Sequence, residues 1–319
     1  MNPKNLLSFT KVVEFGTINR AASQLHITQP ALSRRIGALE DELKTRLFDR
    51  SGQGVTLTDA GMVLRDHADG LLRHIEQVRL ELVTRASTPS GSLSVGLPAP
   101  FRSVISSKLV PAFCIAYPQV KLHVFENSPN LILDMLLAGS LELGVISSED
   151  SQAGLICEPL LTERLFLAGA PDAGLDATQP VAAARLAELP LVQAVRSSAV
   201  RTVLARYFGK QGVELDYNVE VEGIHLMIDV AASGHSFTVL PYSAIREPLK
   251  AGLISAASLT DLTIEWTIAR PLERQISLAS RRFAEALRQA AKAEIDSGDW
   301  LGTRYHAIDL ESPRSAAAS

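Results

Sequence analysis

Apolar residues recur at helical spacing in three short series within the first 45 residues of the chain. Gly16 ends the first series, Thr17 can cap the second, and Thr28 can cap the third. The apolar positions are Leu6, Phe9, Val12 and Val13, then Ala21, Ala22 and Leu25, then Leu32, Ile36, Leu39 and Leu43. This pattern predicts three short helices that each bury one face in a small common core.

A β-hairpin is predicted after the third helix. The stretch 46–58, RLFDRSGQGVTLT, is typical of a strand, a glycine turn and a second strand. Two short helices joined by a tight turn, the second with a threonine cap, form a helix-turn-helix, and a following hairpin forms its wing. Residues 1–58 are therefore predicted to be a winged helix-turn-helix domain that binds DNA.

The third helix turns a polar and cationic face away from its apolar stripe. At 100° per residue Pro30, Ser33 and Arg34 point outward, and Gln29 is free at the N-terminal end. A helix fits the major groove of DNA, where an amide and a guanidinium pair with purine edges and a hydroxyl reaches a base or a phosphate. The alternative is that Arg34 and Arg35 form an ordinary solvated helix surface.

A long helix is predicted between this head and the rest of the chain. Its apolar seam repeats at intervals of four and three residues and consists of Leu64, Ala68, Leu71, Ile75, Val78 and Leu82. A helix with one apolar seam needs a partner, which for a two-fold DNA-binding protein is most simply its own copy. The alternative is that the seam packs on the C-terminal body of the same chain. Residues 87–91, STPSG, follow as a hinge.

From residue 92 the pattern changes to a period of two and then alternates between strand-like and helix-like segments. Strands are predicted at 92–97, 120–126, 141–146, 163–168, 191–195, 217–221, 237–240 and 262–269, and helices at 102–117, 131–137, 181–189, 200–212, 224–233 and 275–292. Repeated βαβ units imply parallel sheets with right-handed crossovers. The body is therefore predicted to consist of two α/β lobes.

The predicted lobes divide the body unequally. Lobe I takes residues 91–161 and, because the last strand and helix return to it, 267–297, whereas lobe II takes 162–266. Residues 59–90 connect the head to the body. Residues 298–319 form a C-terminal tail that is expected to be mobile beyond Trp300. The expected fold is multidomain α+β: a winged helix-turn-helix, a long dimerisation helix, and a two-lobed α/β sensor that resembles periplasmic binding proteins.

Charge is distributed unevenly along the chain. The net charge is −4, but residues 1–65 hold nine lysines and arginines against six acids, a net of +3, and the remainder carries −7. A basic head on an acidic body suits a DNA-binding domain joined to a domain with another task. There is no uncharged apolar run of about 18 residues and no secretory apolar core, so we expect a cytoplasmic protein without membrane contact. Cys114 and Cys157 stand in apolar stretches and are expected to be buried structural residues.

Ligand-binding residues are predicted at the carboxyl ends of the strands, where open α/β sheets bind ligands near helix N-termini. Arg196 and Arg201 would pair with an anionic group such as a carboxylate, unless they are exposed helix residues. Pro98 and Pro100 each remove a backbone N–H donor from the loop after the first strand of the body. Either other groups of this loop replace these donors, or the ligand is not an acid. The candidates are Pro98, Ala99, Pro100, Phe101, Arg102, Ser103, Asn127, Ser128, Ser147, Arg196, Ser197, Ser198, Arg201, Ile224 and Thr238.

No motif in the sequence supports an enzyme. The GxSxG, P-loop, GxGxxG and paired metal motifs are absent, and His123, His225 and His235 have no nucleophile or carboxylate partner at motif spacing. No cofactor and no metal site is predicted, and His67 and His74 are expected to be solvated. The alternatives to a regulator are a two-lobed solute-binding protein, an enzyme on the same body, and a nonspecific architectural DNA-binding protein.

The head carries a specific resemblance. Its run AASQLHITQPALSRRIGALEDELKTRLFDRSGQGVTLTDAG resembles the signature of LysR-type transcriptional regulators, including the elements AA, L-x-x-S/T-Q-P-A-L-S, I-x-x-L-E, L-x-x-x-L-F-x-R and L-T-x-A-G. The family often has arginine at the wing tip, where this chain has Gln53, so we expect weaker dependence on A-tracts and their narrow minor groove. The resemblance implies that DNA contacts fall on Thr28, Gln29, Pro30, Ser33, Arg34 and Arg35.

The resemblance also implies partners and regulation. We expect a homodimer that associates further into a homotetramer, bound to double-stranded DNA at an operator with an interrupted dyad, and contact with RNA polymerase. A small-molecule effector between the two lobes would control DNA binding or bending by shifting the relative placement of the paired heads.

Overall fold

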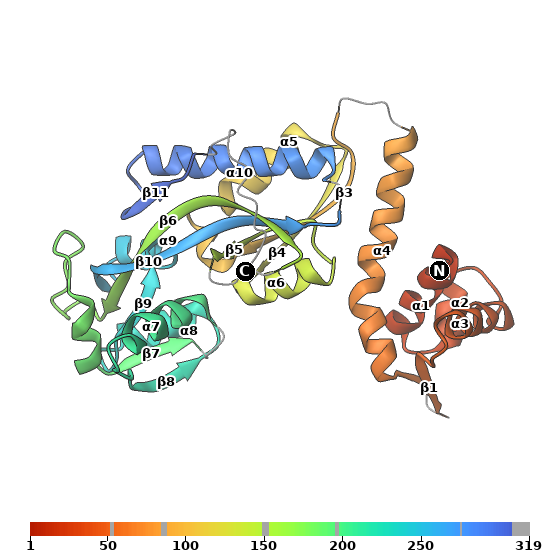
Figure 1. The fold of residues 1–319 in the computed structure, drawn as a ribbon, viewed down its shortest axis with the longest axis horizontal. Coiled ribbons are helices and arrows are strands. Elements are labelled where there is room, and N and C mark those ends of the chain that lie inside the picture. The colour runs from red at the N-terminus through yellow and green to blue at the C-terminus, as the bar shows by residue number, and fades with distance from the viewer. Residues whose placement is uncertain (52–53, 84–87, 149–152, 195–197, 275, 308–319) are drawn as a thin grey trace.

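The computed structural model describes residues 1–51, 54–83, 88–148, 153–194, 198–274 and 276–307. Figure 1 shows a small helical head, a single long helix and a larger α/β body, in that order along the chain. The predicted multidomain fold is confirmed at this level.

The head contains the three predicted helices and the predicted hairpin. They are α1 (Pro3–Phe15), α2 (Ile18–Gln24), α3 (Gln29–Leu43), β1 (Phe48–Ser51) and β2 (Gly54–Leu57). Asn2 caps α1 by accepting a hydrogen bond from Lys4 N, and Thr17 caps α2 by accepting one from Arg20 N. Gly16 ends α1 with φ of 70°, a conformation in which glycine avoids the strain of a Cβ atom.

The core of the head is formed by the predicted apolar stripes, except that Leu43 at the end of α3 is 39% exposed. Phe9 packs against Phe48 of β1, with ring centroids 5.2 Å apart, so the helices and the wing share one core. The buried apolar residues of the three helices are Leu6, Phe9, Val12, Ala21, Ala22, Leu32, Ile36 and Leu39.

The long helix α4 (Asp59–Val83) leaves the head as one element of 25 residues. Thr58 caps it by accepting a hydrogen bond from Gly61 N over 3.0 Å. A helix of this length spans about 37 Å, and Figure 1 shows it standing between the head and the body.

The body is built on a mixed sheet. Among the described residues its strands lie in the order β11–β6–β10–β5–β3–β4, and β9 pairs with β6. A separate pair, β7–β8, belongs to the second lobe. The strands are β3 (Gly91–Pro98), β4 (Val120–Asn127), β5 (Leu143–Ser147), β6 (Leu155–Gly169), β7 (Leu191–Ala194), β8 (Tyr217–Val221), β9 (Thr238–Pro241), β10 (Ser255–Pro271) and β11 (Thr303–Tyr305).

The predicted parallel pairing is correct for only part of this sheet. β3 pairs in parallel with β4 and with β5, and β7 pairs in parallel with β8. The long strands β6 and β10 are antiparallel to each other, and β10 is antiparallel to β5. The reason is topological: β6 leads the chain into the second lobe and β10 brings it back, so they run in opposite directions.

Helices flank both lobes of the body. In the first lobe they are η1 (Ala99–Arg102), α5 (Ser106–Ala116), α6 (Pro129–Leu137) and α10 (Leu278–Asp296); in the second they are η3 (Ala183–Glu188), α7 (Ala199–Gly209), α8 (Ile224–Ala232) and α9 (Tyr242–Lys250). The predicted helix at 102–117 is divided into η1 and α5, and the predicted helix at 181–189 is the 3-10 helix η3. α9 was not predicted, because its buried face includes the polar residues Ser243 and Arg246 and its pattern is therefore not that of an apolar stripe.

Part of the expected C-terminal tail belongs to the body. β11 pairs antiparallel with β6, and Trp300 is 2% exposed. A mobile chain beyond Trp300 is therefore wrong for residues 301–306, because the buried indole and the added strand fix them. Residues 308–319 lie outside the described part of the chain.

Two smaller expectations are also tested by the structure. Cys114 is exposed on α5 rather than buried, while Cys157 is half-buried. Within the described residues, no helix combines the length and apolar character needed to cross a membrane.

Candidate DNA-reading face and ligand cavity

The outer face of α3 is polar and open. Gln29, Pro30 and Arg34 are exposed and Ser33 is half-buried, whereas Leu32 lies in the core. Gln29 Nε2 donates to Ser33 Oγ, and Arg34 Nε donates to Pro30 O, each over 3.4 Å. Both distances are longer than those of ordinary N–H···O hydrogen bonds, so both contacts are weak and the amide and the guanidinium can turn toward a DNA groove.

Arg35 differs from its neighbour because it lies against the head. Its Nη1 donates to Ser8 Oγ over 3.4 Å, and Ser8 is fully buried in α1. The side chain of Arg35 is thus a link between α3 and α1. Thr28 precedes α3 but makes no capping hydrogen bond through its side chain, contrary to expectation, and its exposed hydroxyl remains available.

The wing is anchored to α3 by Glu40, a residue for which no role was predicted. Glu40 Oε1 accepts hydrogen bonds from the backbone of Leu47 over 2.8 Å and of Phe48 over 3.4 Å. Its position in the I-x-x-L-E element was the available signal. The wing-tip residue Gln53 lies outside the described residues.

The seam predicted for dimerisation is divided by the structure. Ala68 is fully buried, and Leu64 and Leu71 are half-buried, all three in the core of their own head. These positions are therefore filled within the chain, because α1 packs across the first half of α4. Ile75 is half-buried; the side chains of Val78 and Leu82 lie outside the described part.

A cavity of about 500 Å³ lies between the two lobes. The elements around it are η1 after β3, the ends of β4 and β8, the first turns of α6, α7 and α8, and strands β7, β9 and β10. Six predicted ligand residues line it, namely Ala99, Pro100, Asn127, Ser128, Ser198 and Ile224. Each stands at the end of a strand or in the segment that follows one, so the structure brings together strand ends that are distant in sequence.

The remaining predicted ligand residues are not among those that line this cavity. Phe101, Ser147 and Thr238 are buried. Ser103 Oγ donates to Ser243 O over 3.0 Å, and Arg102 faces a neighbouring hollow of about 820 Å³ between η1, α8 and α9. Pro98 ends β3 just before the lining begins. Arg196 and Ser197 lie outside the described residues.

Arg201 has partners other than a ligand. Its Nη1 lies 2.5 Å from Glu220 Oε1 and 3.0 Å from Ala194 O, and the guanidinium lies over the ring of Tyr217, 3.7 Å from its centroid. The side chain is 12% exposed. This internal ion pair compensates the charge that the sequence analysis assigned to an anionic ligand.

Several lining residues were not predicted. The side chains of Gln193, Met227, Leu240, Ile264 and Trp266 form the inner wall, and all are nearly fully buried. Gln193 is held by Nε2 donating to Val239 O over 2.9 Å. Gln193 and Leu240 stand near the ends of strands and could have been found by the same rule as Asn127; Ile264 and Trp266 lie within a long strand and could not.

The charges of the cavity are unexpected for a site that binds acids. Glu126 and Glu222 stand on its rim, and the described lining contains no lysine, arginine or histidine. The first turns of α6 and α7 are capped by Ser128 and Ser198, whereas α8 follows Gly223, which has no side chain to cap it. The backbone N–H groups in the first turn of α8 are therefore the groups in this cavity that would stabilise a negative charge.

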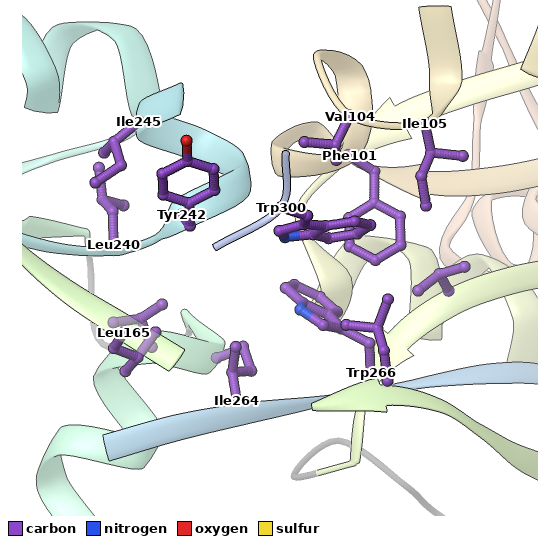
Figure 2. Packing of buried hydrophobic residues seen from close by; sticks show 14 of the residues in the cluster. Phe101, Val104, Ile105, Leu165, Leu240, Tyr242, Ile245, Ile264, Trp266 and Trp300 are labelled. Carbon is purple, nitrogen blue, oxygen red and sulfur yellow. The ribbon is translucent and has the colours of Figure 1, made fainter. Parts of the chain in front are cut away.

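A buried carboxylate lies behind the inner wall. Glu163 of β6 accepts hydrogen bonds from Ser243 N (2.6 Å), Ser243 Oγ (3.1 Å), Trp266 Nε1 (3.0 Å) and Trp300 Nε1 (2.8 Å). Figure 2 shows the two indoles one above the other, with the ring of Phe101 beside them; its centroid is 5.1 Å from that of Trp266 and 5.4 Å from that of Trp300. Burial raises the pKa of the Glu163 carboxyl above its ordinary value, against the lowering effect of its four donors.

Comparison with known families covers nearly the whole described chain. Residues 3–62 match the bacterial regulatory helix-turn-helix proteins of the lysR family, and residues 86–292 match the LysR substrate binding domain. The nitrogen assimilation regulatory protein nac of Klebsiella aerogenes is 36% identical over 247 residues, which cover 77% of this chain and 80% of that protein.

Solved structures show the same fold. A full-length OxyR variant from Pseudomonas aeruginosa superposes with a TM-score of 0.68 at 23% identity, covering 92% of this chain and 95% of the other. Full-length CbnR in complex with its target DNA superposes with a TM-score of 0.63 at 22% identity, covering 91% of this chain and 100% of the other.

Proposed function

Because the chain belongs to the LysR family of transcriptional regulators, we propose that it binds a specific operator through α3 and alters that binding when a small molecule occupies the cavity between its lobes. The observation that carries this proposal is the division of α3 into two faces. Leu32, Ile36 and Leu39 are buried, while Gln29 and Arg34 on the other side are exposed. Such a helix can enter a major groove without disturbing its own core.

We assign different tasks to the polar residues of α3. Gln29 and Arg34 are placed to contact base edges, and Ser33 to contact a base or a phosphate. Thr28, with its uncapped hydroxyl, suits a phosphate contact, and Pro30 borders the same surface. Arg35 holds α3 against Ser8, so its contribution to DNA binding is expected to be indirect. For Gln53 we retain the expectation of weak A-tract dependence.

The functional unit is proposed to be a homodimer that associates into a homotetramer. The related structure of CbnR contains target DNA, and two heads on one operator require an interrupted dyad. Within α4 the residues left for the dimer are Ile75, Val78 and Leu82, since the earlier seam residues pack on the head. We also propose contact with RNA polymerase and a cytoplasmic location.

The effector is proposed to be a small molecule with an apolar body. The inner wall is formed by Met227, Leu240, Ile264 and Trp266. A carboxylate group on it would depend on helix N-terminal amides such as those of α8, because Arg201 is paired with Glu220. We keep the lobe limits expected from the sequence, 91–161 with 267–297 in one lobe and 162–266 in the other, and add β11 to the body because it pairs with β6. The pairing of β6 with β10 has a register shift between Trp266 and Thr267, where the chain is proposed to pass from one lobe to the other.

The test of the proposed function is footprinting of the full-length protein on the DNA upstream of its own gene at several salt concentrations. We expect protection of an interrupted dyad, with an affinity that falls as salt rises but stays above that for random DNA. Equal affinity for both DNAs at every salt concentration would contradict a sequence-specific regulator.

A further inference from the structure

Helix α6 connects the cavity with α4. Its first residues line the cavity, where Ser128, Pro129 and Leu131 form part of the wall. After nine helical residues, about 13 Å, it ends in the loop 138–140, which contacts α4. One short helix thus has its N-terminal end at the ligand site and its C-terminal end at the connector of the head.

The backbones of this loop and of α4 lie in close contact. His67 Nδ1 donates to Ala138 O over 2.9 Å, and Ser140 Oγ donates to Asp66 O over 3.0 Å. Between these two hydrogen bonds the backbones meet at Gly70 and Gly139, both buried. A methyl group added at Gly70 would overlap the carbonyl oxygen of Gly139. No larger residue fits at position 70 unless the loop moves away.

Glycine at position 70 has no other evident use. Glycine is a poor helix former, and this one stands in the interior of a 25-residue helix. Gly139 is held at φ of 70°, where a side chain would be strained, and the guanidinium of Arg274 lies against it. The contact between α4 and the loop therefore explains Gly70, whereas the left-handed turn that ends α6 explains Gly139.

α6 is also fixed tightly to the sheet beneath it. Gly96 of β3 and Gly144 of β5 are paired side by side, and a Cβ atom on either would lie 2.6 Å from Ile132 Cγ2. Ile132 is fully buried in the notch that these two glycines leave. Since close-packed groups transmit displacement rather than absorb it, α6 and the strands beneath it are expected to move as one body, so that a shift at the cavity end of α6 is carried to the loop 138–140.

From these observations we propose that α6 couples the cavity to α4, and that the Gly70–Gly139 contact is the joint through which a change of ligand occupancy reaches the head. The head follows α4 because Leu64 and Ala68 pack in its core. The proposal rests on the proposed function, since it takes a ligand at one end and DNA at the other. It requires a contact with two states, formed and separated, whose balance both ends influence.

The first test asks whether the contact exists in solution. Hydrogen exchange of the full-length protein is measured by mass spectrometry for wild type, Gly70→Ala and the control Gly209→Ala, whose glycine ends helix α7 with open space around it. In Gly70→Ala we expect the amides of residues 139–141 to exchange faster by on the order of tenfold, with the control unchanged. His67→Ala, a milder change, should show a smaller effect of the same kind. Unchanged exchange in both α4 variants would overturn the proposal.

The second test asks whether the two ends are coupled. Leu131→Trp places bulk in the cavity at the start of α6, and Ile115→Trp, on the 82% exposed Ile115 of α5, is the control. We expect Leu131→Trp to change hydrogen exchange at residues 66–71 and 139–141 relative to the wild type. Added to Gly70→Ala, it should cause no further change relative to Gly70→Ala alone. The same change in both backgrounds, or no change in either, would overturn the coupling. Specific operator binding by the wild type is measured alongside. If the wild type binds the operator specifically but the two ends of α6 are not coupled, only the coupling is refuted. If the wild type does not bind the operator specifically, the proposed function is refuted.

Discussion

Trp266 and Trp300 donate hydrogen bonds to different oxygens of a single buried carboxylate, that of Glu163. Trp266 belongs to the wall of the cavity, whereas Trp300 belongs to the C-terminal segment that follows α10. Ser243 at the start of α9 donates to the same two oxygens. The cavity wall, α9 and the C-terminal segment are therefore held together by one side chain.

This arrangement predicts a stability that depends on pH through Glu163. Its pKa is raised in the folded protein from the ordinary value of 4.5, chiefly by burial. Its contribution to stability is thus complete below pH 4.5 and is lost as the pH rises through the raised pKa. Glu163→Gln cannot titrate, so the advantage in unfolding free energy of the wild type over this variant should shrink as the pH rises above 4.5 and through the raised pKa of Glu163.

The measurement for Glu163 is urea unfolding followed by tryptophan fluorescence, since both tryptophans contact this carboxyl. Glu265→Gln, an exposed glutamate on the neighbouring strand β10, is the matched control and should keep the pH profile of the wild type. A difference between wild type and Glu163→Gln that widens with rising pH would show that the four donors outweigh burial.

Arg34 and Arg35 are adjacent but are expected to behave differently. Arg34→Ala should weaken binding to the operator by about 1 to 3 kcal/mol and leave binding to random DNA nearly unchanged, because it removes a contact to bases. Arg35→Ala should instead lower the thermal stability of the head, because its side chain joins α3 to Ser8 of α1. Gel-shift titrations on both DNAs and thermal melts distinguish these outcomes. Equal loss on both DNAs for Arg34→Ala would reassign it to a phosphate contact.

The second half of the α4 seam is expected to mediate dimerisation. Ile75→Asp combined with Val78→Asp should convert the dimer to monomer, because two carboxylates would be buried at an apolar interface. Analytical ultracentrifugation measures the change, and Asp69→Ala, an exposed position on the same helix, provides the control. A sedimentation coefficient identical to that of the wild type would place the dimer interface elsewhere.

The cavity is tested at Ser198. Ser198→Trp should abolish the thermal shift produced by small molecules that stabilise the wild type, while operator binding is retained. Ser198→Ala is the matched control: it removes the cap on Arg201 N, at a cost of about 1 kcal/mol, but leaves the cavity open. It should therefore still respond. A normal response in Ser198→Trp would move the ligand site out of this cavity.

The sequence predicted the head better than the body for a physical reason. Contacts in the head are local, and stripes such as Leu32, Ile36 and Leu39 define both the helix and the face it buries. In the body, α9 escaped prediction because Arg246 is buried there by an ion pair with Glu294, 2.6 Å away and distant in sequence. Periodicity records only apolar burial, so helices stabilised by buried polar contacts are missed.

The same limit applies to the ligand cavity. The rule of strand ends found Asn127 and Ser198, because topology alone brings those loops together. It could not show that Arg201 is paired with Glu220, nor that Ser103 donates to Ser243, since both depend on partners far along the chain. The sequence could predict which strand-end loops come together, but it could not predict which of their polar groups remain unpaired.

The pairing of β11 with β6 determines where the chain can be shortened. A fragment that ended at residue 297, after the last long helix, would expose the edge of β6 from Leu161 to Glu163 and deprive the buried carboxyl of one indole donor. An unpaired strand edge beside apolar surface is a template for aggregation. Fragments of the sensor should therefore extend through His306, whose backbone N–H donates to Leu160 O over 2.9 Å.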